Sequence, residues 1–359
     1  MQDAIIKVLL VSSVLFSSQT IANEKKVLPG SVTNNELQNQ QKVATKEFST
    51  PILERVENPT IKSYLAGLSS AQAYVGSYVQ STGETIDRFF GTDISEVSEK
   101  GSRLIVYAPF TYYDNGDSVS SLNFKAQIDL PRTNHRWKVL VSSFEGDEEQ
   151  NSNSLNQSGI KPSNTQNTVD NDTQNTLAGR YLFESTKGII AQMDMGLKFI
   201  NYIEPNPFVK YKVRYKNNFE NKVESRTTQN LYLERERGFA WEGQQVFDYK
   251  LNPKWLARGQ TSATWWREDS EILLNQKAIL FESVSPIRAR AYFLDGNWNI
   301  NNEDAMFKSV AFGMNWRERL YHNWLYSEFE PRATWSETDS FKEPEYSVRL
   351  MLEMHFYTY

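Results

Sequence analysis

The feature that most constrains the fold is a two-residue alternation of apolar and polar side chains, which starts near Ser102 and continues to the end of the chain. Between residues 209 and 216, valine or tyrosine alternates with lysine or arginine at every position. Near the end, Leu350 and Leu352 alternate with Arg349 and Glu353. A period of two is that of a β-strand, whose successive side chains point to opposite faces of the sheet. The sequence therefore predicts an all-β region whose strands each have an apolar and a charged face.

The alternating segments predict about 14 strands, with 12 as the alternative. They lie near residues 104–110, 119–130, 136–144, 180–185, 188–199, 207–217, 225–236, 239–251, 255–267, 271–283, 286–298, 306–317, 321–335 and 345–356. The segments near 180 and 188 are alternatively one broken strand. Turn signals separate the strands at Asp114-Asn115-Gly116-Asp117, Glu204-Pro205-Asn206-Pro207, Asn252-Pro253, Ser285-Pro286 and Asp295-Gly296-Asn297.

Strand length favours a membrane barrel over a soluble β-sandwich, which also alternates. Most predicted strands run to about ten residues or more, above the globular mode of about 5–6 and close to the 9–11 that cross a bilayer at a tilt. All nine Trp follow residue 130. Those near predicted strand ends, as in the aromatic girdles of such barrels, are Trp241, Trp255, Trp265, Trp266, Trp298 and Trp335. Because a bilayer forbids free sheet edges, residues 99–359 are predicted to form a transmembrane antiparallel up-and-down β-barrel.

The N-terminal part has a different pattern. Residues 1–22 are predicted to be a signal peptide, with Lys7, a short apolar core and Ala22 at the cleavage site. That core is too short to span the bilayer. Residues 23–50 are polar and predicted to be disordered. Within a helical segment at 51–98, residues 60–90 have apolar residues every three or four positions, and Thr60 is the expected N-cap. This helix packs on another element or, alternatively, binds a partner.

Composition excludes several classes of protein. The chain has no cysteine, which excludes disulfide scaffolds and cysteine-ligated metals. A net charge of −5 argues against nucleic acid as a partner.

Residues 146–178 are rich in Asn, Ser, Gln and Thr, have no aromatic residue, and are predicted to be a flexible loop.

No catalytic or metal-binding constellation stands out, so we expect no cofactor, no metal and no enzyme. There is no Gly-x-Ser-x-Gly elbow, and His322 precedes Asn323 directly, so the two side chains would point to opposite faces. His135, His322 and His355 are the three histidines, and no His-x-His pair suggests a metal site.

The charged faces of the strands are the candidate functional surface. The residues expected to line the interior are Lys210, Lys212, Arg214, Lys216, Arg288, Arg290, Arg317, Glu328, Glu330, Arg332, Arg349 and Glu353. They predict a narrow channel for small polar or anionic solutes. The alternative is a non-conducting structural barrel, whose charges fill the interior and which docks a periplasmic or envelope partner.

Three motifs carry a resemblance to a known group. A helix ends in Asp87-Arg88-Phe89-Phe90-Gly91, an early turn has Leu130-Pro131-Arg132, and a late strand has Trp324-Leu325-Tyr326-Ser327-Glu328-Phe329-Glu330-Pro331. From about residue 85 to the end, the chain resembles a poorly characterised group of proteobacterial outer-membrane β-barrel proteins. The resemblance implies fold and location and brings no agreed activity. In its register Phe356 is the terminal aromatic residue, with Tyr357-Thr358-Tyr359 as an extension.

The expected location is the outer membrane of a Gram-negative bacterium. An even strand count leaves both termini in the periplasm and the loop at 146–178 outside. Expected partners are outer-membrane lipid and lipopolysaccharide, the barrel-assembly machinery and a possible periplasmic partner of the helix at 60–90.

Overall fold

The structure is a computed structural model that describes residues 50–90, 102–130, 133, 136–143, 175–183, 188–200, 204–219, 223–268, 271–301 and 305–357. The chain divides into two units, Met1–Glu47 and Phe48–Tyr359, and every described residue belongs to the second. The predicted signal peptide, nearly all of the predicted disordered segment, His135 and most of the predicted loop at 146–178 lie outside the described residues.

Two helical elements precede the strands. The 3-10 helix η1 spans Ile52–Arg55 and the helix α3 spans Pro59–Phe90, which confirms the helical pattern. Asn58, and not Thr60, caps α3, because its Oδ1 accepts the backbone N–H of Thr60 at 2.9 Å. Pro59 then occupies the first helical position, where a missing N–H costs nothing. Of the helices described, none is both long and apolar enough to cross a membrane.

Among the described residues, fifteen strand segments form one antiparallel sheet. They are β1 (Arg103–Tyr113), β2 (Ser118–Ser120), β3 (Asn123–Asp129), β4 (Trp137–Ser142), β5 (Asn175–Leu182), β6 (Ile189–Ile200), β7 (Glu204–Phe219), β8 (Val223–Glu234), β9 (Gly238–Lys250), β10 (Trp255–Trp266), β11 (Ile272–Ser285), β12 (Arg288–Ile300), β13 (Ala305–Tyr321), β14 (Leu325–Ser336) and β15 (Glu345–Tyr357). The 3-10 helix η5 (Glu337–Asp339) follows β14.

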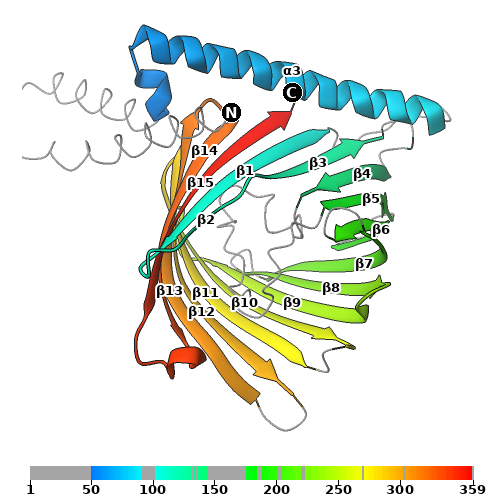
Figure 1. The fold of residues 1–359 in the computed structure, drawn as a ribbon, viewed down its shortest axis with the longest axis vertical. Coiled ribbons are helices and arrows are strands. Elements are labelled where there is room, and N and C mark those ends of the chain that lie inside the picture. The colour runs from blue at the N-terminus through cyan, green and yellow to red at the C-terminus, as the bar shows by residue number, and fades with distance from the viewer. Residues whose placement is uncertain are drawn as a thin grey trace, which may run out of the picture. The chain divides into compact units, whose positions relative to one another are not determined.

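The sheet closes because β1 pairs with β15 along eleven residues, from Arg103 opposite Tyr357 to Tyr113 opposite Ser347. β2 and β3 pair with successive parts of β1 and so act as one broken strand. The result is a closed antiparallel barrel of 14 strands (Figure 1). The predicted fold class and the preferred strand count are both confirmed.

Most predicted turns are confirmed, and the exceptions have a physical cause. Gly116 has φ of 92° in the predicted hairpin after Tyr113, a conformation that glycine adopts without strain. Asp295-Gly296-Asn297, however, lies inside β12 and not in a turn, because the polar barrel interior supplies partners for Asp295. The segment 204–207 likewise belongs to β7. Residues 175–178 belong to β5 and not to a loop, and β5 and β6 are separate strands.

Two further boundaries differ from the expectation. His322 lies in the turn between β13 and β14 with φ of 41°, and its backbone N–H donates to Glu54 at 2.8 Å. Tyr357 still pairs with Arg103, so β15 continues one residue beyond Phe356.

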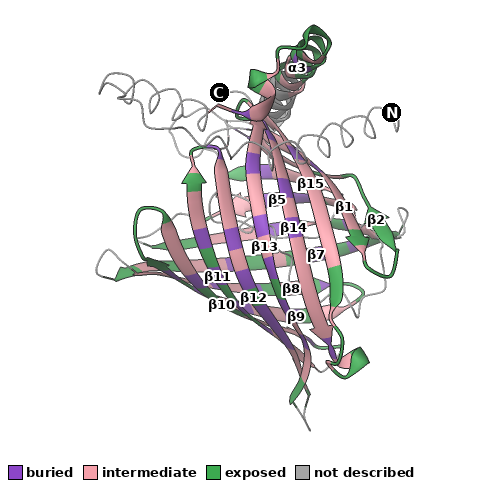
Figure 2. Cartoon of the chain, turned by 90° about the vertical axis from the view of Figure 1, so that its left-hand side faces the viewer, coloured by how far each residue is buried: buried purple, intermediate pink, exposed green. Residues whose placement is uncertain are grey.

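Burial separates the two faces of the sheet. On β12 the residue Phe293 is 1% exposed, whereas its neighbour Leu294 is 53% exposed. Figure 2 shows this alternation between buried and less buried residues along the neighbouring strands. Because the sheet is closed, the buried set faces the barrel interior and the other set faces outward.

Among the described residues, the polar interior has one apolar cluster. Ile279 and Phe281 of β11 pack with Ala291 and Phe293 of β12, and Leu256 of β10 packs against them. Phe293 lies opposite Gly313 of β13. A Cβ at position 313 would lie 2.8 Å from the carbonyl oxygen of Pro331 and would also meet the Phe293 ring. Gly313 therefore makes the space that Phe293 fills.

Replacing Gly313 by alanine should lower the free energy of unfolding by about 1–3 kcal/mol, because the added methyl group overpacks a closed site. Gly179→Ala is the matched control, since the nearest atom to a Cβ there is 3.8 Å away, at an ordinary van der Waals distance. Urea unfolding in lipid vesicles, followed by tryptophan fluorescence, measures both variants. Equal stability of the two would contradict tight packing around Phe293.

Candidate functional site

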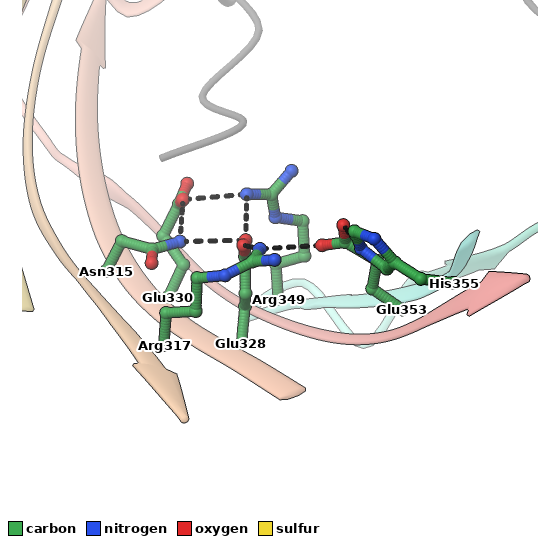
Figure 3. A network of polar contacts seen from close by, with 7 residues as sticks. All are labelled: Asn315, Arg317, Glu328, Glu330, Arg349, Glu353 and His355. Atoms are coloured by element: carbon green, nitrogen blue, oxygen red, sulfur yellow. Dashed lines mark hydrogen bonds and ion pairs between the residues drawn. The ribbon is translucent and has the colours of Figure 1, made fainter. Parts of the chain in front are cut away.

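The centre of the interior wall is an ion-pair network carried by β13, β14 and β15 (Figure 3). Arg317 donates to both Glu328 and Glu353, the latter at 2.6 Å. Glu328 pairs with Arg317 across β13 and β14, and the guanidinium of Arg317 lies 4.8 Å from the centre of the Tyr326 ring. The network continues to His355, whose Nε2 hydrogen bonds with Glu353. One arginine thus bridges two buried carboxylates.

A second group of contacts extends this network towards the other end of the same strands. Arg349 donates to Glu330 at 2.8 Å, and Arg332 does so at 3.2 Å. The Asn315 amide donates to Glu328 and Glu330 at 3.2 and 3.1 Å and so links the two groups. Because the side chains of Glu328 and Glu330 are 1% and 4% exposed, their charges depend on these partners.

Further ion pairs brace other strands of the wall. Arg180 binds Asp194 through two bonds of 2.7 and 2.8 Å. Lys198 pairs with Glu234 across the intervening strand β7. Asp248 accepts from Arg258 of β10 and from Arg226 of β8. Two-pronged arginine–carboxylate contacts fix geometry as well as charge, so the side chains hold their strands in register.

The Asp295 carboxylate lies beside the apolar cluster. Its Oδ1 accepts from Asn275 at 2.5 Å and its Oδ2 lies 3.9 Å from Lys277 Nζ. The Lys277 ammonium is 5.2 Å from the centre of the Phe293 ring, within cation–π range. The predicted turn residue is therefore a fully buried part of the interior wall.

The basic stripe, defined here as Lys210, Lys212, Arg214 and Lys216, runs along the inner face of β7. Its residues share that face with the buried Asn206 and Phe208. Lys210 lies 4.9 Å from the centre of the Tyr232 ring, and Lys216 pairs with Glu224 at 2.9 Å. Between Asn206 and Asn218 the inner face of β7 has four cations and no carboxylate. In the order of strands β7 is seven places from β14, so the stripe faces the ion-pair network across the barrel.

The expectation that Arg288 and Arg290 line the interior is wrong. On β12 the side chains of Ala291 and Phe293 are buried and point inward, so those of residues 288 and 290 point outward. Outside the barrel, Arg290 pairs with Glu282 at 3.5 Å and its guanidinium lies 4.4 Å from the centre of the Trp316 ring. Such a cation–aromatic pair is typical of a membrane interface, where long basic side chains reach the headgroups.

Arg288 belongs to the same outer region and pairs with Glu318 at 2.8 Å. Among the tryptophans expected in the girdles, Trp255 faces outward and stacks on Tyr292. Trp266 faces inward instead, with the guanidinium of Arg237 3.8 Å from its ring centre.

The other expected interior residues, which are Lys210, Lys212, Arg214, Lys216, Arg317, Glu328, Glu330, Arg332, Arg349 and Glu353, all lie on the inner face. The structure brings Arg317, the three glutamates and the two remaining arginines into one network and keeps the basic stripe apart from it.

Several buried interior ions were not among the predicted residues, and they include Arg180, Asp194, Arg258 and Asp295. Their signal was the same alternation. Asp194 and Lys198 are four residues apart on β6, and Arg258 lies between two apolar or small neighbours on β10. Because each strand has a two-residue period, one residue known to face inward would have assigned the other charges of that strand to a face.

Within the described parts of the chain, no group of three or more His, Asp or Glu residues is placed to hold a metal ion. His355 contacts Glu353 and the Tyr326 ring, while His322 lies in a turn beside Glu54. These two histidines therefore lie in different surroundings.

An apolar exterior, a charged interior and 14 closed antiparallel strands define the class of this protein as an outer-membrane-type β-barrel. No protein-family model matches the sequence, and the search of curated proteins gives no significant match. Solved structures are similar at low identity. The outer-membrane channel DcaP of Acinetobacter baumannii is 11% identical, with a TM-score of 0.40, over 74% of this chain and all of that one.

Two other solved structures are similar over comparable lengths. OmpT, an outer-membrane protein of Vibrio cholerae, is 8% identical with a TM-score of 0.42, over 74% of this chain and 100% of that one. An outer-membrane channel from Pseudomonas putida F1 is 12% identical with a TM-score of 0.37, over 74% of this chain and 98% of that one. Similarities this low carry no information about solute or partner.

Replacing Arg317 by methionine should lower the free energy of unfolding by about 3–5 kcal/mol, because it leaves Glu328 and Glu353 as buried carboxylates without their main cation. Lys308→Met is the control. Its pair with Glu337 has side chains 32% and 39% exposed, and such a pair contributes at most about 1 kcal/mol. Urea unfolding in vesicles tests both, and equal losses would contradict a stabilising role for the network.

Proposed function

We propose that this protein is an outer-membrane channel for small polar solutes, with a preference for anions. The observation that carries the proposal is the basic stripe, four cations at alternate positions of β7 on the inner face. Their spacing repeats along the strand, so an anion that leaves one cation meets the next. Rings or rows of basic side chains select anions in pores.

The opposite wall supports the same preference. The carboxylates of β14 are Glu328 and Glu330, and each of them is bonded to arginine. The arginines therefore balance the charge of these two glutamates, and a cation in the pore would bind them only weakly. On the inner face of β7, all four charges from Lys210 to Lys216 are positive. This local excess of positive charge favours anions near β7.

The outer surface supports placement in a membrane. On β6, for example, Met193, Met195 and Leu197 face outward, as lipid contact requires. We place both termini in the periplasm, since an even number of strands brings them to one end. In that orientation the end of β4 at Ser142 lies on the side of the cell exterior. Lipid and lipopolysaccharide surround the barrel, and the assembly machinery inserts it.

A second candidate function rests on a different observation. α3 leaves Tyr64 and Tyr74 72% and 71% exposed, while its Gln72 side chain donates to the His355 carbonyl of β15 at 3.3 Å. A helix held on the barrel with exposed aromatic residues suits a structural barrel that docks a periplasmic partner. Deletion of residues 51–95 separates the two functions, because a channel still conducts whereas a docking protein loses its partner.

Planar-bilayer recording of the refolded protein tests the channel directly. We expect stable current steps and a reversal potential that favours anions. Lys210→Glu with Lys216→Glu should move the reversal potential towards cations, because it inverts two charges of the stripe that are not buried. Arg288→Glu with Arg290→Glu is the control and should leave selectivity unchanged, since both residues face outward.

Gel mobility before and after heating establishes on the same samples that each variant is folded. A folded protein that passes no current would refute the channel and favour the docking alternative. A conducting protein whose selectivity follows the outward pair and not the stripe would refute the assignment of β7.

A further inference from the structure

The outer face of the barrel has a polar row that crosses four neighbouring strands. Thr227 of β8 lies opposite Gln245 of β9, Gln245 opposite Thr261 of β10, and Thr261 opposite Gln276 of β11. Each faces outward, because its chain neighbours Thr228, Val246 and Lys277 are among the buried interior residues. All four lie away from the ends of their strands. We call these four residues the outer polar row.

Hydrogen bonds join the row to further polar residues beside it. Thr227 donates to Gln245 Oε1 at 2.6 Å, and the Gln245 amide donates to Ser225 at 2.9 Å. On the same face the Trp241 indole donates to Gln229 at 2.8 Å. The surface over β8 and β9 is thus an organised polar network and not a single stray residue.

At the other end of the row, two polar side chains have no partner. Thr261 and Gln276 are both exposed, and neither side chain makes a hydrogen bond within the described part of the chain. Small residues surround them, with Gly259 and Ala263 on β10 and Ala278 on β11. Another backbone could therefore approach this surface closely.

Elsewhere the outer face is apolar at comparable positions. β15 presents Val348, Leu350 and Leu352, and β7 presents Val209 and Val213. An amide without a partner is expensive in hydrocarbon, and protein contacts within membranes are enriched in small residues and in Ser, Thr and Gln side chains that bond across the interface. The row has the composition of such a contact.

We propose that the outer polar row is the contact between two copies of this chain in the membrane. The inference rests on the proposed membrane location. The row has no charge, and its hydroxyl and amide groups both donate and accept. It is therefore complementary to itself, as a two-fold contact between identical surfaces requires. A two-fold axis through the middle of the row, between Gln245 and Thr261, places these two residues near their counterparts in the second copy.

The absence of cysteine in the chain makes a clean crosslinking test possible. Thr261→Cys introduces a single thiol near the proposed axis, and Val348→Cys introduces one of similar size on the outer face of β15. Oxidation in native membranes should give a disulfide-linked dimer for Thr261→Cys and none for Val348→Cys. Equal yields from the two variants, or a link only to a different protein, would overturn the proposal.

A second variant tests the contact without a crosslink. Gln245→Leu with Gln276→Leu keeps the outer surface compatible with lipid, so the barrel should still fold. We expect light scattering in mild detergent to give a dimer for the wild type and a monomer for the variant. A wild type that is folded and monomeric would overturn the inference, as would a variant that remains a dimer.

The failure of the proposed function looks different. If the protein does not fractionate with the outer membrane, the membrane location itself is wrong. If it fractionates there and conducts but is a monomer, the channel stands and only the contact between copies is refuted.

Discussion

The hydrogen-bonded pairing of β1 with β15 is the contact on which every other feature of the barrel depends. It joins the two ends of the sheet over eleven residue pairs and leaves no open edge, which is the condition for a sheet to exist in hydrocarbon. Closure also gives each strand a distinct inside and outside. An arginine on one face becomes part of an ion-pair network, while an arginine on the other meets the membrane interface.

The interior is stabilised by charges in place of a large apolar core. Arg317, Arg349 and Arg332 bond three glutamates on β14 and β15, and the only buried apolar cluster found in the described chain is the small one around Phe293. Such a wall is expensive to disrupt, because each partner left behind is a buried charge. The basic stripe on β7 lies across from this network, and its positive charge is the basis of the proposed preference for anions.

The exterior has the opposite composition to the interior. Most of it is apolar, so the outer polar row over β8–β11 and the arginine–aromatic pairs on β12 and β13 mark places where the surroundings change. The arginines suit the headgroup level of the bilayer. The row lies away from the strand ends. Lipid tails offer no hydrogen bonds there, so a polar partner has to come from protein.

The sequence alone determined the period of the strands, their number and the helix before them, because alternation and helical spacing are local properties of a chain. It also placed ten of the twelve candidate interior residues on the inner face. It misplaced Arg288 and Arg290, since which of two alternating faces is inward depends on packing across the sheet, and there the aromatic ring of Phe293 occupies the interior. It took Asp295-Gly296-Asn297 for a turn, since only closure brings Asn275 and Lys277 to that carboxylate. Pairings between distant strands, including Arg317 with Glu353, were decided by the tertiary structure, because parity along one strand says nothing about which residue of the next strand lies opposite.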